Sequence, residues 1–420
     1  MAQTAIEKIL ARTSGRATVA PGEIVVCDVD RAVLLDMQFS STAVPWRQPN
    51  AVAHAERLAV VLDHGAPAPS LRDAEGHTLA RKFCQRFDVA EFYDVGRHGI
   101  CHQIIAENGL ARPGELLLCA DSHTCAAGAF NTAARGVGGI EMLQIACTGS
   151  TWFVVSESTE VTLEGSLANH VEGKDLFLAL ARQHGSAQNR NLEFTGSGVA
   201  ELSLHDRRTV ATQCAEINAE FALFPADEVI LAYLAERGVD DTSPVVPDTD
   251  ADYADMWHLD LTAIEPHVAV PGKIVGNVET AATVRGQRLD QCFIGSCANG
   301  HLEDFAIAAE ILDGRHVASG TRLIVTPASQ QVYLDAVKAG YVATIVSAGG
   351  LVTSSTCGAC FGYHMGVLGD GEICLTASTR NFQGRMGSPM SEVYMASTST
   401  VAASAIAGQI VDPREITDAG

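Results

Sequence analysis

The chain has 420 residues, of which 47% are hydrophobic and 19% are charged, and its formal net charge is −22. This length predicts two to three domains, and the composition excludes a chain that is largely disordered. The negative charge opposes non-specific binding to DNA, RNA or anionic membranes, although a few arginines can still attract a small anion locally.

The N-terminal segment MAQTAIEKILARTSG has an amphipathic pattern and lacks the features of a signal peptide. No apolar run in the chain approaches the roughly 20 residues that are needed to cross a bilayer. Most of the 12 cysteines stand inside apolar strings, which is typical of buried free thiols in a reducing compartment. We therefore expect a cytoplasmic protein that does not span a membrane.

Short apolar runs alternate along the chain with segments of helical periodicity. The runs predict buried strands at residues 56–65, 114–123, 290–297, 321–329 and 371–379. Apolar residues at spacing i, i+3 and i+4 predict helices at residues 301–312, 330–340 and 399–411. This alternation predicts an α/β fold with largely parallel sheets, in which ligands bind beyond the carboxyl ends of the strands.

Two changes in the sequence pattern indicate domain boundaries. Near residues 155–165 a glycine-rich helical stretch gives way to the alternating pattern STEVTLEGSL, and near residues 240–275 the chain is acidic and contains prolines. We therefore predict α/β domains at residues 1–158, 159–270 and 271–420.

Three cysteines stand outside the apolar strings. Cys357 and Cys360 form a CxxC pair, and Cys297 ends the predicted strand CFIGSC before the turn ANGHLED. The CxxC pair alone is compatible with metal binding, a redox dithiol or simple packing. A redox dithiol should open a helix in a much smaller fold, and a structural zinc site should offer a fourth cysteine or histidine. Three loop cysteines fit a cubane iron–sulfur cluster in which one iron lacks a protein thiolate and can act as a Lewis acid.

Four segments, taken in sequence order, resemble the aconitase superfamily. They are CADSHTCAAGAFNTAARGVGGIEM (119–142), FIGSCANG (293–300), STCGACFGYHMGVL (355–368) and STRNFQGRMGSPMSEVYMASTSTVAASAIAG (378–408). The closest likeness is to the large, catalytic subunits of the 3-isopropylmalate dehydratase/homoaconitase group. The resemblance implies three α/β/α domains around a central iron–sulfur cleft, with the cluster cysteines in the third domain and without the swivelling fourth domain of full-length aconitases.

The resemblance assigns Cys297, Cys357 and Cys360 as the ligands of a [4Fe–4S] cluster. In this family, the iron without a protein ligand binds the hydroxyl and one carboxylate of a small di- or tricarboxylate. Water is eliminated and then returned at the neighbouring carbon. The resemblance therefore implies a hydro-lyase that isomerises a hydroxy acid, and this reaction needs both a proton donor and a positioned base.

Polar residues follow two of the predicted strands, and a histidine lies between them in sequence. These residues are Asp63, His64, His102, Asp121, Ser122 and His123. An isolated Asp-His pair is usually a turn or a cap, whereas a carboxylate that is bonded to imidazole fixes its tautomer and raises its pKa, as a general acid requires. The resemblance places the three histidines in the site, with His64 protonating the leaving hydroxyl and Asp63 behind it. We expect Asp121 to act with them and Ser122 to contact the substrate.

Three further charged residues are carried over from the resemblance. Glu216, in QCAEINAEF, taken alone is typical of an exposed helix acid, and the resemblance implies that it reaches the water on the iron. Arg380 and Arg385, in TRNFQGR, would ordinarily form surface ion pairs, and the resemblance implies that they bind substrate carboxylates. Such a local positive charge would be needed to attract a dianion to so acidic a chain.

Three positions depart from the motifs that the resemblance rests on. The common form of the first cysteine motif is GSCTNGR, and here Ala298 and His301 replace its threonine and arginine. The arginine loop usually begins NRNF, and here Thr379 replaces the leading asparagine, which normally supports the cluster. The resemblance therefore does not specify what surrounds the cluster at these positions.

Full-length aconitases continue into a swivelling domain. It carries the serine that abstracts the proton and an arginine that binds substrate, in a GSSRE-like loop. No such loop occurs in this sequence. We therefore expect a separate small subunit to complete the active site, and little turnover from this chain alone.

The sequence thus predicts the large subunit of a hydro-lyase that acts on a 2-alkylmalate, with isopropylmalate as the first candidate. Homoaconitate, dimethylmalate, citramalate-type acids and a specialised-metabolite analogue are compatible alternatives. From another class, a cluster-sensing RNA-binding protein is an alternative that the charge of −22 disfavours. A four-thiolate electron carrier would need a further ligand such as Cys292.

Overall fold

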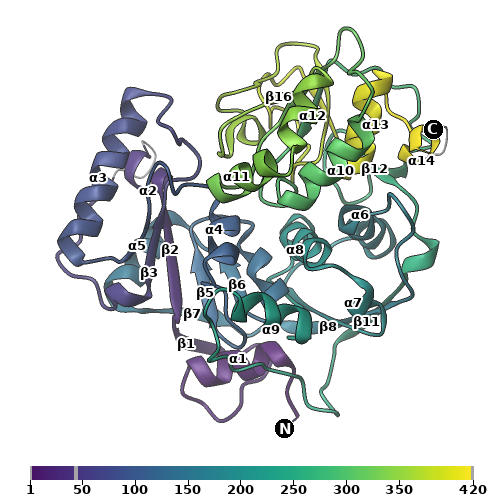
Figure 1. Ribbon diagram of the computed structural model, residues 1–420. Coiled ribbons are helices and arrows are strands. Elements are labelled where there is room, and N and C mark those ends of the chain that lie inside the picture. Colours follow the sequence, from purple (N-terminus) through teal and green to yellow (C-terminus); the bar gives the residue numbers. More distant parts are fainter. Residues whose placement is uncertain (1, 42–45, 418–420) are drawn as a thin grey trace. The chain divides into compact units, whose positions relative to one another are not determined.

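The computed structural model describes residues 2–41 and 46–417 of the chain (Figure 1). The chain forms two compact units whose segments interleave along the sequence. Unit 1 comprises Met1–Glu164, Ala187–Ala200 and Asn218–Leu259, and unit 2 comprises Gly165–Ser186, Glu201–Ile217 and Asp260–Gly420. The domain ranges 1–158, 159–270 and 271–420 stay a prediction.

Unit 1 contains a five-stranded parallel sheet in the order β4-β3-β2-β5-β6. Its strands are β2 (Arg31–Leu35), β3 (Leu58–Val61), β4 (Glu91–Tyr93), β5 (Leu116–Cys119) and β6 (Ala133–Gly136). Every residue of β3 and β5 is buried, as expected for parallel strands that are covered on both faces. Apolar side chains of three helices complete the core, namely α1 (Ala5–Thr13), α3 (Leu71–Phe87) and α5 (Gly139–Thr148).

Unit 1 also contains two smaller sheets and several short helices. A four-stranded sheet has the order β10-β9-β8-β11, and β1 pairs with β7 in an antiparallel ribbon. The bounds are β1 (Ile24–Asp28), β7 (Ser150–Val154), β8 (Glu157–Glu164), β9 (Arg190–Thr195), β10 (Phe221–Leu223), β11 (Asp255–Asp260), α2 (Asp36–Ser40), η1 (Ala55–Arg57), α4 (Cys101–Glu107), η2 (Thr124–Phe130), α7 (Gly198–Glu201) and α9 (Glu228–Ala235).

Three neighbouring strands of the five-stranded sheet each deliver an aspartate at the carboxyl end. Asp36 follows β2 directly, Asp63 lies two residues after β3, and Asp121 lies two residues after β5. Because β2 lies between β3 and β5 and all three run parallel, their carboxyl ends meet at one edge. The sheet topology therefore gathers three acids that are far apart in sequence.

Unit 2 is built on a seven-stranded sheet in the order β13-β12-β18-β17-β14-β15-β16. The strands from β18 to β16 in this order are parallel, and β12 pairs antiparallel with both β13 and β18. The strand bounds are β12 (His267–Ala269), β13 (Val278–Thr280), β14 (Gln291–Ile294), β15 (Arg322–Val325), β16 (Leu351–Val352), β17 (Ile373–Thr376) and β18 (Glu392–Ala396).

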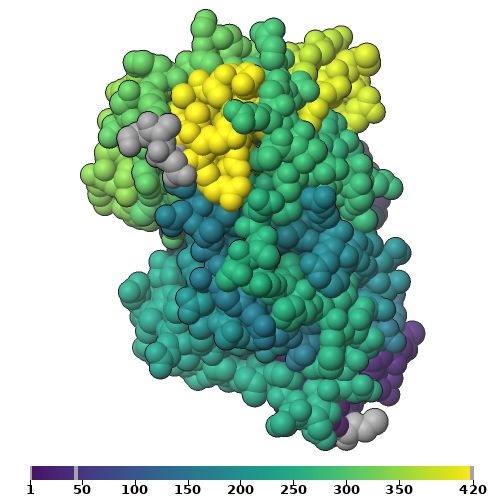
Figure 2. All heavy atoms as spheres, turned by 90° about the vertical axis from the view of Figure 1, so that its right-hand side faces the viewer, coloured from purple at the N-terminus to yellow at the C-terminus, as the bar shows by residue number. Residues whose placement is uncertain are grey.

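Helices and turns of unit 2 surround this sheet. Their bounds are α6 (Gly173–His184), α8 (Leu204–Gln213), η3 (Cys214–Ile217), η4 (Leu261–Ala263), α10 (Leu302–Leu312), α11 (Gln330–Lys338), α12 (Tyr341–Ser347), η5 (Gly358–Phe361), α13 (Thr398–Ala407) and α14 (Pro413–Thr417). The C-terminal segment, coloured yellow in Figure 2, lies at the surface of this unit. There Arg285 Nη1 donates to Glu415 Oε1 at 2.8 Å.

The two faces of the seven-stranded sheet carry different cores. Cys292 and Ile294 of β14 pack with α10 to α13, whereas Phe293 between them packs in a separate cluster that includes Cys360. This division follows from the period of two along a strand, which sends successive side chains to opposite faces. The CxxC segment is therefore packed on the face opposite to the main helical layer.

The strands and helices that the sequence predicted are present, and the α/β fold with parallel sheets is confirmed. Each observed strand is shorter than its predicted range; for example, the run at residues 114–123 contains β5 at Leu116–Cys119. The difference arises because the polar residues at the end of each run leave the sheet. They form loops beyond the last paired residue.

Gly128 provides a test of the packing in unit 1. A β-carbon at this position would lie 1.6 Å from the carbonyl oxygen of Ala222, which is backbone and cannot move aside. We expect Gly128→Ala to lower the free energy of unfolding by about 3 kcal/mol or more, measured by urea denaturation. Gly138→Ala is the matched control, because nothing lies within 4 Å of the added carbon there, and it should be nearly neutral. Equal stability of the two variants would contradict this packing.

Candidate active site

The aspartates at the edge of the unit 1 sheet are surrounded by histidines. His102 Nε2 lies 2.8 Å from Asp121 Oδ1, which also accepts a hydrogen bond of 2.8 Å from the backbone N–H of His123. His64 Nε2 lies 3.7 Å from the other oxygen of Asp121. The structure thus brings Asp121 together with all three predicted histidines, and each of these histidines is buried.

The other ring nitrogen of His64 faces two further carboxylates. Its Nδ1 lies 3.6 Å from Asp63 Oδ2 and 3.9 Å from Asp36 Oδ1. Asp63 Oδ2 also accepts a hydrogen bond of 3.0 Å from the backbone N–H of Cys101, at the start of α4. His64 is therefore flanked by acids at both ring nitrogens, which stabilises the protonated imidazolium form.

The carboxylates of this cluster differ in acidity. Burial opposes ionisation of Asp121, but hydrogen bonds from His102 and His123 outweigh it and hold the pKa of Asp121 well below its usual range. Burial raises the pKa of Asp63, despite the favourable charge of His64. The cluster therefore combines an ionised carboxylate with one that retains its proton more readily, as acid–base chemistry requires.

Asp36 and His77 belong to the same cluster, although neither was predicted from the sequence. Asp36 accepts hydrogen bonds from the backbone N–H groups of His64, at 3.2 Å, and Gly65, at 2.7 Å. His77 Nε2 of α3 lies 3.9 Å from Asp36 Oδ2. Burial opposes ionisation of Asp36, but His77, His64 and these amides together lower its pKa. Asp36 could have been found, because it follows the apolar run RAVLL as Asp63 follows LAVVL. His77 has no such signal.

In unit 2, the loop after β14 places Cys297 in a strained turn. The preceding Ser296 is buried and has φ of 96°, a conformation that non-glycine residues seldom adopt. Thr209 Oγ1 of α8 donates to the carbonyl oxygen of Ala298 at 2.8 Å, and Gly295 pairs with Asn299 across the loop. Neighbouring backbone and side chains thus hold the Cys297 loop in one conformation.

The second cysteine loop follows β16. Cys360 lies in η5 and is 1% exposed, whereas Cys357 immediately before η5 is half-buried. The backbone N–H of Cys360 donates to the carbonyl oxygen of Cys357 at 3.1 Å. This turn explains the CxxC spacing, since it orders two residues between the cysteines and brings their backbones together.

Arg385 connects the three cysteines. Its Nη2 lies 3.8 Å from Cys360 Sγ, and although burial opposes its charge, the thiols of Cys360, Cys357 and Cys297 raise the pKa of Arg385. Its Nε is buried without a hydrogen-bond partner among the residues that the structure describes. The three thiols therefore lie near one buried guanidinium.

Lys174 is a second buried cation, and no motif in the sequence predicted its role. Its Nζ donates to the carbonyl oxygens of Ala377, at 3.1 Å, and Ser378, at 2.9 Å, in the loop after β17. Burial lowers the pKa of Lys174 to about 8, an effect that the nearby Cys297 and Cys360 thiols oppose. Lys174 thus joins α6 to the arginine loop and adds positive charge near the cysteines.

The donor set suits an iron–sulfur cluster. Cysteine thiolates are the protein ligands of such clusters, and the three cysteines here lie near the buried cations Arg385 and Lys174. A separate group of possible metal ligands, formed by His205, His301 and Asp304, has its ligand atoms within 4.8 Å of one another.

Arg380, in the loop after β17, forms an ion pair with Glu216. Arg380 Nε donates to Glu216 Oε1 at 2.7 Å, and the two side chains are 24% and 13% exposed. Glu216 lies in the turn η3 after α8, rather than within a long helix. The pair holds the Arg380 side chain in place while leaving part of it accessible to an anion.

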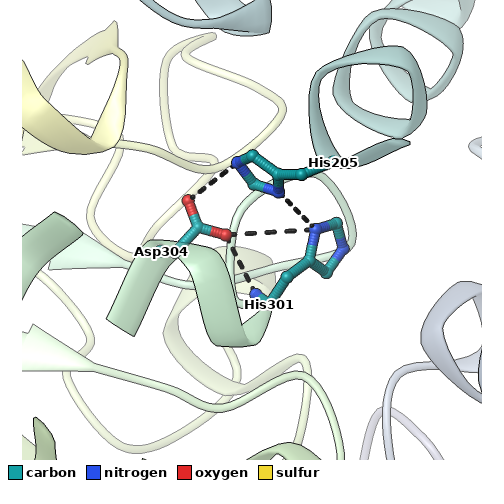
Figure 3. Close-up of side chains that lie close together, drawn as sticks. All are labelled: His205, His301 and Asp304. Atoms are coloured by element: carbon teal, nitrogen blue, oxygen red, sulfur yellow. Dashed lines mark hydrogen bonds and ion pairs between the residues drawn. The ribbon is translucent and has the colours of Figure 1, made fainter. Parts of the chain in front are cut away.

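Four further positions that the sequence singled out differ in their burial and contacts. Ser122 is exposed between Asp121 and His123. Cys292 packs in the apolar core of unit 2, where burial raises the pKa of its thiol, so it does not suit the fourth ligand of an electron carrier. Of the departures from the motif, Thr379 is buried, and His301 contacts His205 (Figure 3).

A family model described as the aconitase family (aconitate hydratase) matches residues 30–277 and 272–408. The chain belongs to the aconitase family. It is 56% identical to the 3-isopropylmalate dehydratase large subunit of Mycolicibacterium smegmatis, over 99% of this chain and 98% of that protein. It is 41% identical to the 3-isopropylmalate dehydratase large subunit 1 of Methanopyrus kandleri, over 99% of both chains.

Among solved structures, the aconitase X of Thermococcus kodakaraensis matches with a TM-score of 0.48 and 11% identity, over 84% of each chain. The family assignment confirms the predicted relationship and the prediction of a hydro-lyase. Members of this family generally use a [4Fe–4S] cluster. No helix in the part of the chain that the structure describes is long and apolar enough to cross a membrane.

The opposite pKa shifts of Asp36 and Asp63 predict opposite effects on stability. At pH 7, Asp36→Asn should lower the free energy of unfolding by about 1–3 kcal/mol, because an ionised acceptor of several donors is lost. Asp63→Asn should be neutral or stabilising, because it removes a buried charge. As pH falls from 7 to 4.5, the Asp63→Asn advantage should shrink, since Asp63 takes up its proton above the usual range. The Asp36→Asn deficit should persist until below about pH 4.

Urea denaturation of the cluster-free chain at several pH values measures both effects. Asp73→Asn in α3 serves as a further comparison for a buried aspartate, because Asp73 accepts a hydrogen bond from Ser70, the cap residue of that helix. A pH dependence that is the same for Asp36→Asn and Asp63→Asn would contradict the assignment of their acidities.

Proposed function

We propose that this chain is the large subunit of a hydro-lyase that interconverts 3-isopropylmalate and 2-isopropylmalate by dehydration and rehydration. The observation that carries the proposal is the 56% identity, over nearly the full length of both chains, to a protein named as the large subunit of 3-isopropylmalate dehydratase. The buried acid–imidazole cluster and the cysteines beside Arg385 support it, because the reaction needs acid–base groups and a Lewis acid.

Cys297, Cys357 and Cys360 would hold the [4Fe–4S] cluster. When bound, the cluster supplies an iron without a protein ligand, which polarises the hydroxyl group that leaves. Arg385 and Lys174 contribute positive charge near the three cysteines, and this charge would offset the negative charge of a buried thiolate-bound cluster.

Arg380 is proposed to bind a substrate carboxylate. Its guanidinium is oriented by Glu216 and is partly exposed, so it can also donate hydrogen bonds to a substrate carboxylate. In a chain with a net charge of −22, this local positive site provides the attraction that a dianionic substrate needs.

His64 is proposed to protonate the leaving hydroxyl. Asp63 and Asp36 face its Nδ1 and Asp121 faces its Nε2, and these charges favour the imidazolium form that can donate a proton. Asp121 also orients His102 and His123, and Ser122 is exposed beside them for contact with the substrate. We propose that a separate small subunit supplies the base that removes the carbon-bound proton, and that the protein acts in the cytoplasm.

Cluster binding tests the assignment of the cysteines. After anaerobic reconstitution with iron and sulfide, the wild-type chain should contain four irons and show cluster absorbance, whereas Cys297→Ala, Cys357→Ala and Cys360→Ala should each lose most of both. The control is Cys147→Ala, at an exposed cysteine, which should retain them. A full cluster in any of the three variants would show that the replaced cysteine is not a ligand.

Activity with a small subunit tests the reaction and the substrate. The reconstituted chain should hydrate and dehydrate isopropylmalate when it is mixed anaerobically with the candidate small subunit, and should show little turnover alone. A panel with homoaconitate, dimethylmalate and citramalate-type acids decides the substrate by the ratio of kcat/KM. Full activity of the chain alone, or a higher kcat/KM for another acid, would overturn the corresponding part of the proposal.

Arg380→Lys should raise KM by about tenfold or more with a smaller effect on kcat, because lysine cannot form the paired hydrogen bonds of a guanidinium with a carboxylate. The matched control is Arg322→Lys, since Arg322 Nη2 forms an exposed ion pair of 2.8 Å with Glu372. An unchanged KM for Arg380→Lys would exclude Arg380 as a carboxylate ligand.

A further inference from the structure

His205 and His301 meet in the interior of unit 2, next to the loop that carries Cys297. Their Nδ1 atoms are 2.9 Å apart and their rings are perpendicular, at 89° (Figure 3). His205 belongs to α8, and His301 precedes α10 as its N-terminal cap residue. The side chains are 5% and 2% exposed, so water does not compete for this contact.

Asp304 completes the group and ties it to the Cys297 loop. One oxygen of Asp304 accepts from the backbone N–H of His301 at 2.9 Å, and the other accepts from Asn299 Nδ2 at 3.0 Å and Thr398 Oγ1 at 2.5 Å. The Nε2 of His205 lies 3.6 Å from the latter oxygen. Asp304 therefore holds the end of the loop, while the imidazole pair holds the cap residue of the helix that follows it.

A metal ion fits this group less well than a hydrogen bond does. Two histidine nitrogens on a tetrahedral zinc lie about 3.3 Å apart, which is longer than the 2.9 Å observed. Both oxygens of Asp304 already accept hydrogen bonds, and the charges of Arg208 and Lys174 lie near His301 and oppose a further cation. The 2.9 Å contact is a hydrogen bond between imidazoles, in which one Nδ1 donates and the other accepts.

We propose that His205 and His301 act as a pair of positioning residues that fix the Cys297 loop and thereby determine how firmly the cluster is held. This inference rests on the proposed function, since it requires that Cys297 is a cluster ligand. Neither histidine is assigned a contact with substrate. Because the pair acts as a unit, removing either ring should abolish the whole effect.

The experiment uses the reconstituted full chain with His205→Ala, His301→Ala and the double variant. We expect each single variant to lose its cluster to a chelator at least about fivefold faster than wild type, with a changed EPR spectrum of the reduced cluster. The double variant should be no worse than either single variant. His258→Ala, at an exposed histidine, is the control and should behave as wild type.

A charge exchange provides the sharper test. His301→Arg alone should accelerate cluster loss, whereas His205→Glu combined with His301→Arg should restore the rate to within about twofold, because the acid can receive the guanidinium. If an alanine variant does not fold, the phenylalanine variant at the same position replaces it, since a phenyl ring fills the space of the imidazole without a hydrogen-bonding nitrogen. The thermal midpoint of each variant is also measured without the cluster. An unchanged midpoint shows that the substitution weakens cluster binding and does not destabilise the fold.

The outcomes separate the two proposals. A wild-type chain that takes up no cluster would overturn the proposed function, and the inference with it. A wild-type chain that holds a cluster while the single variants lose it at the wild-type rate with an unchanged EPR spectrum would overturn the inference alone. Additive effects of the two substitutions on the rate of cluster loss would also overturn it. So would one zinc ion per wild-type chain that is absent from both single variants, because the histidines would then be zinc ligands.

Discussion

Compensation of buried charge is the constraint on which the arrangement of both units depends. A carboxylate or a thiolate away from water is unfavourable unless hydrogen-bond donors or cations face it. In unit 1, parallel strands bring Asp36, Asp63 and Asp121 to one edge, and imidazoles and backbone amides surround them. In unit 2, Arg385 and Lys174 face the cysteines. The same requirement thus shapes two chemically different clusters.

The buried carboxylates of unit 1 receive unequal numbers of hydrogen bonds and cations, and their pKa values therefore differ. Asp121 has two histidine donors, which lower its pKa, whereas the burial of Asp63 is only partly offset and its pKa is raised. A catalytic reaction that both donates and removes protons depends on such differences between chemically identical groups. Here the difference comes from the number and direction of donors, which the loops after β3 and β5 determine.

Two of the positions that depart from the family motif are buried among polar groups. His301 contacts the imidazole of His205, and its backbone N–H donates to Asp304. Lys174 reaches the backbone of the arginine loop after β17, beside the buried Thr379. The loops that carry the cysteines and the arginines are therefore held by contacts between buried polar residues. Replacing one residue of such a contact leaves its partner buried without a hydrogen bond.

The sequence by itself determined the α/β class, the strands and helices, the cysteine motif and the family. Each of these depends on local periodicity or on contiguous motifs, which can be read along the chain. Asp36 carried a weak local signal, but His77, Lys174 and the His205–His301 contact carried none. Their partners lie 28 to 204 residues away in sequence. Only the tertiary structure decided these contacts, and with them the acidities, because burial and donor geometry arise from the packing of distant segments.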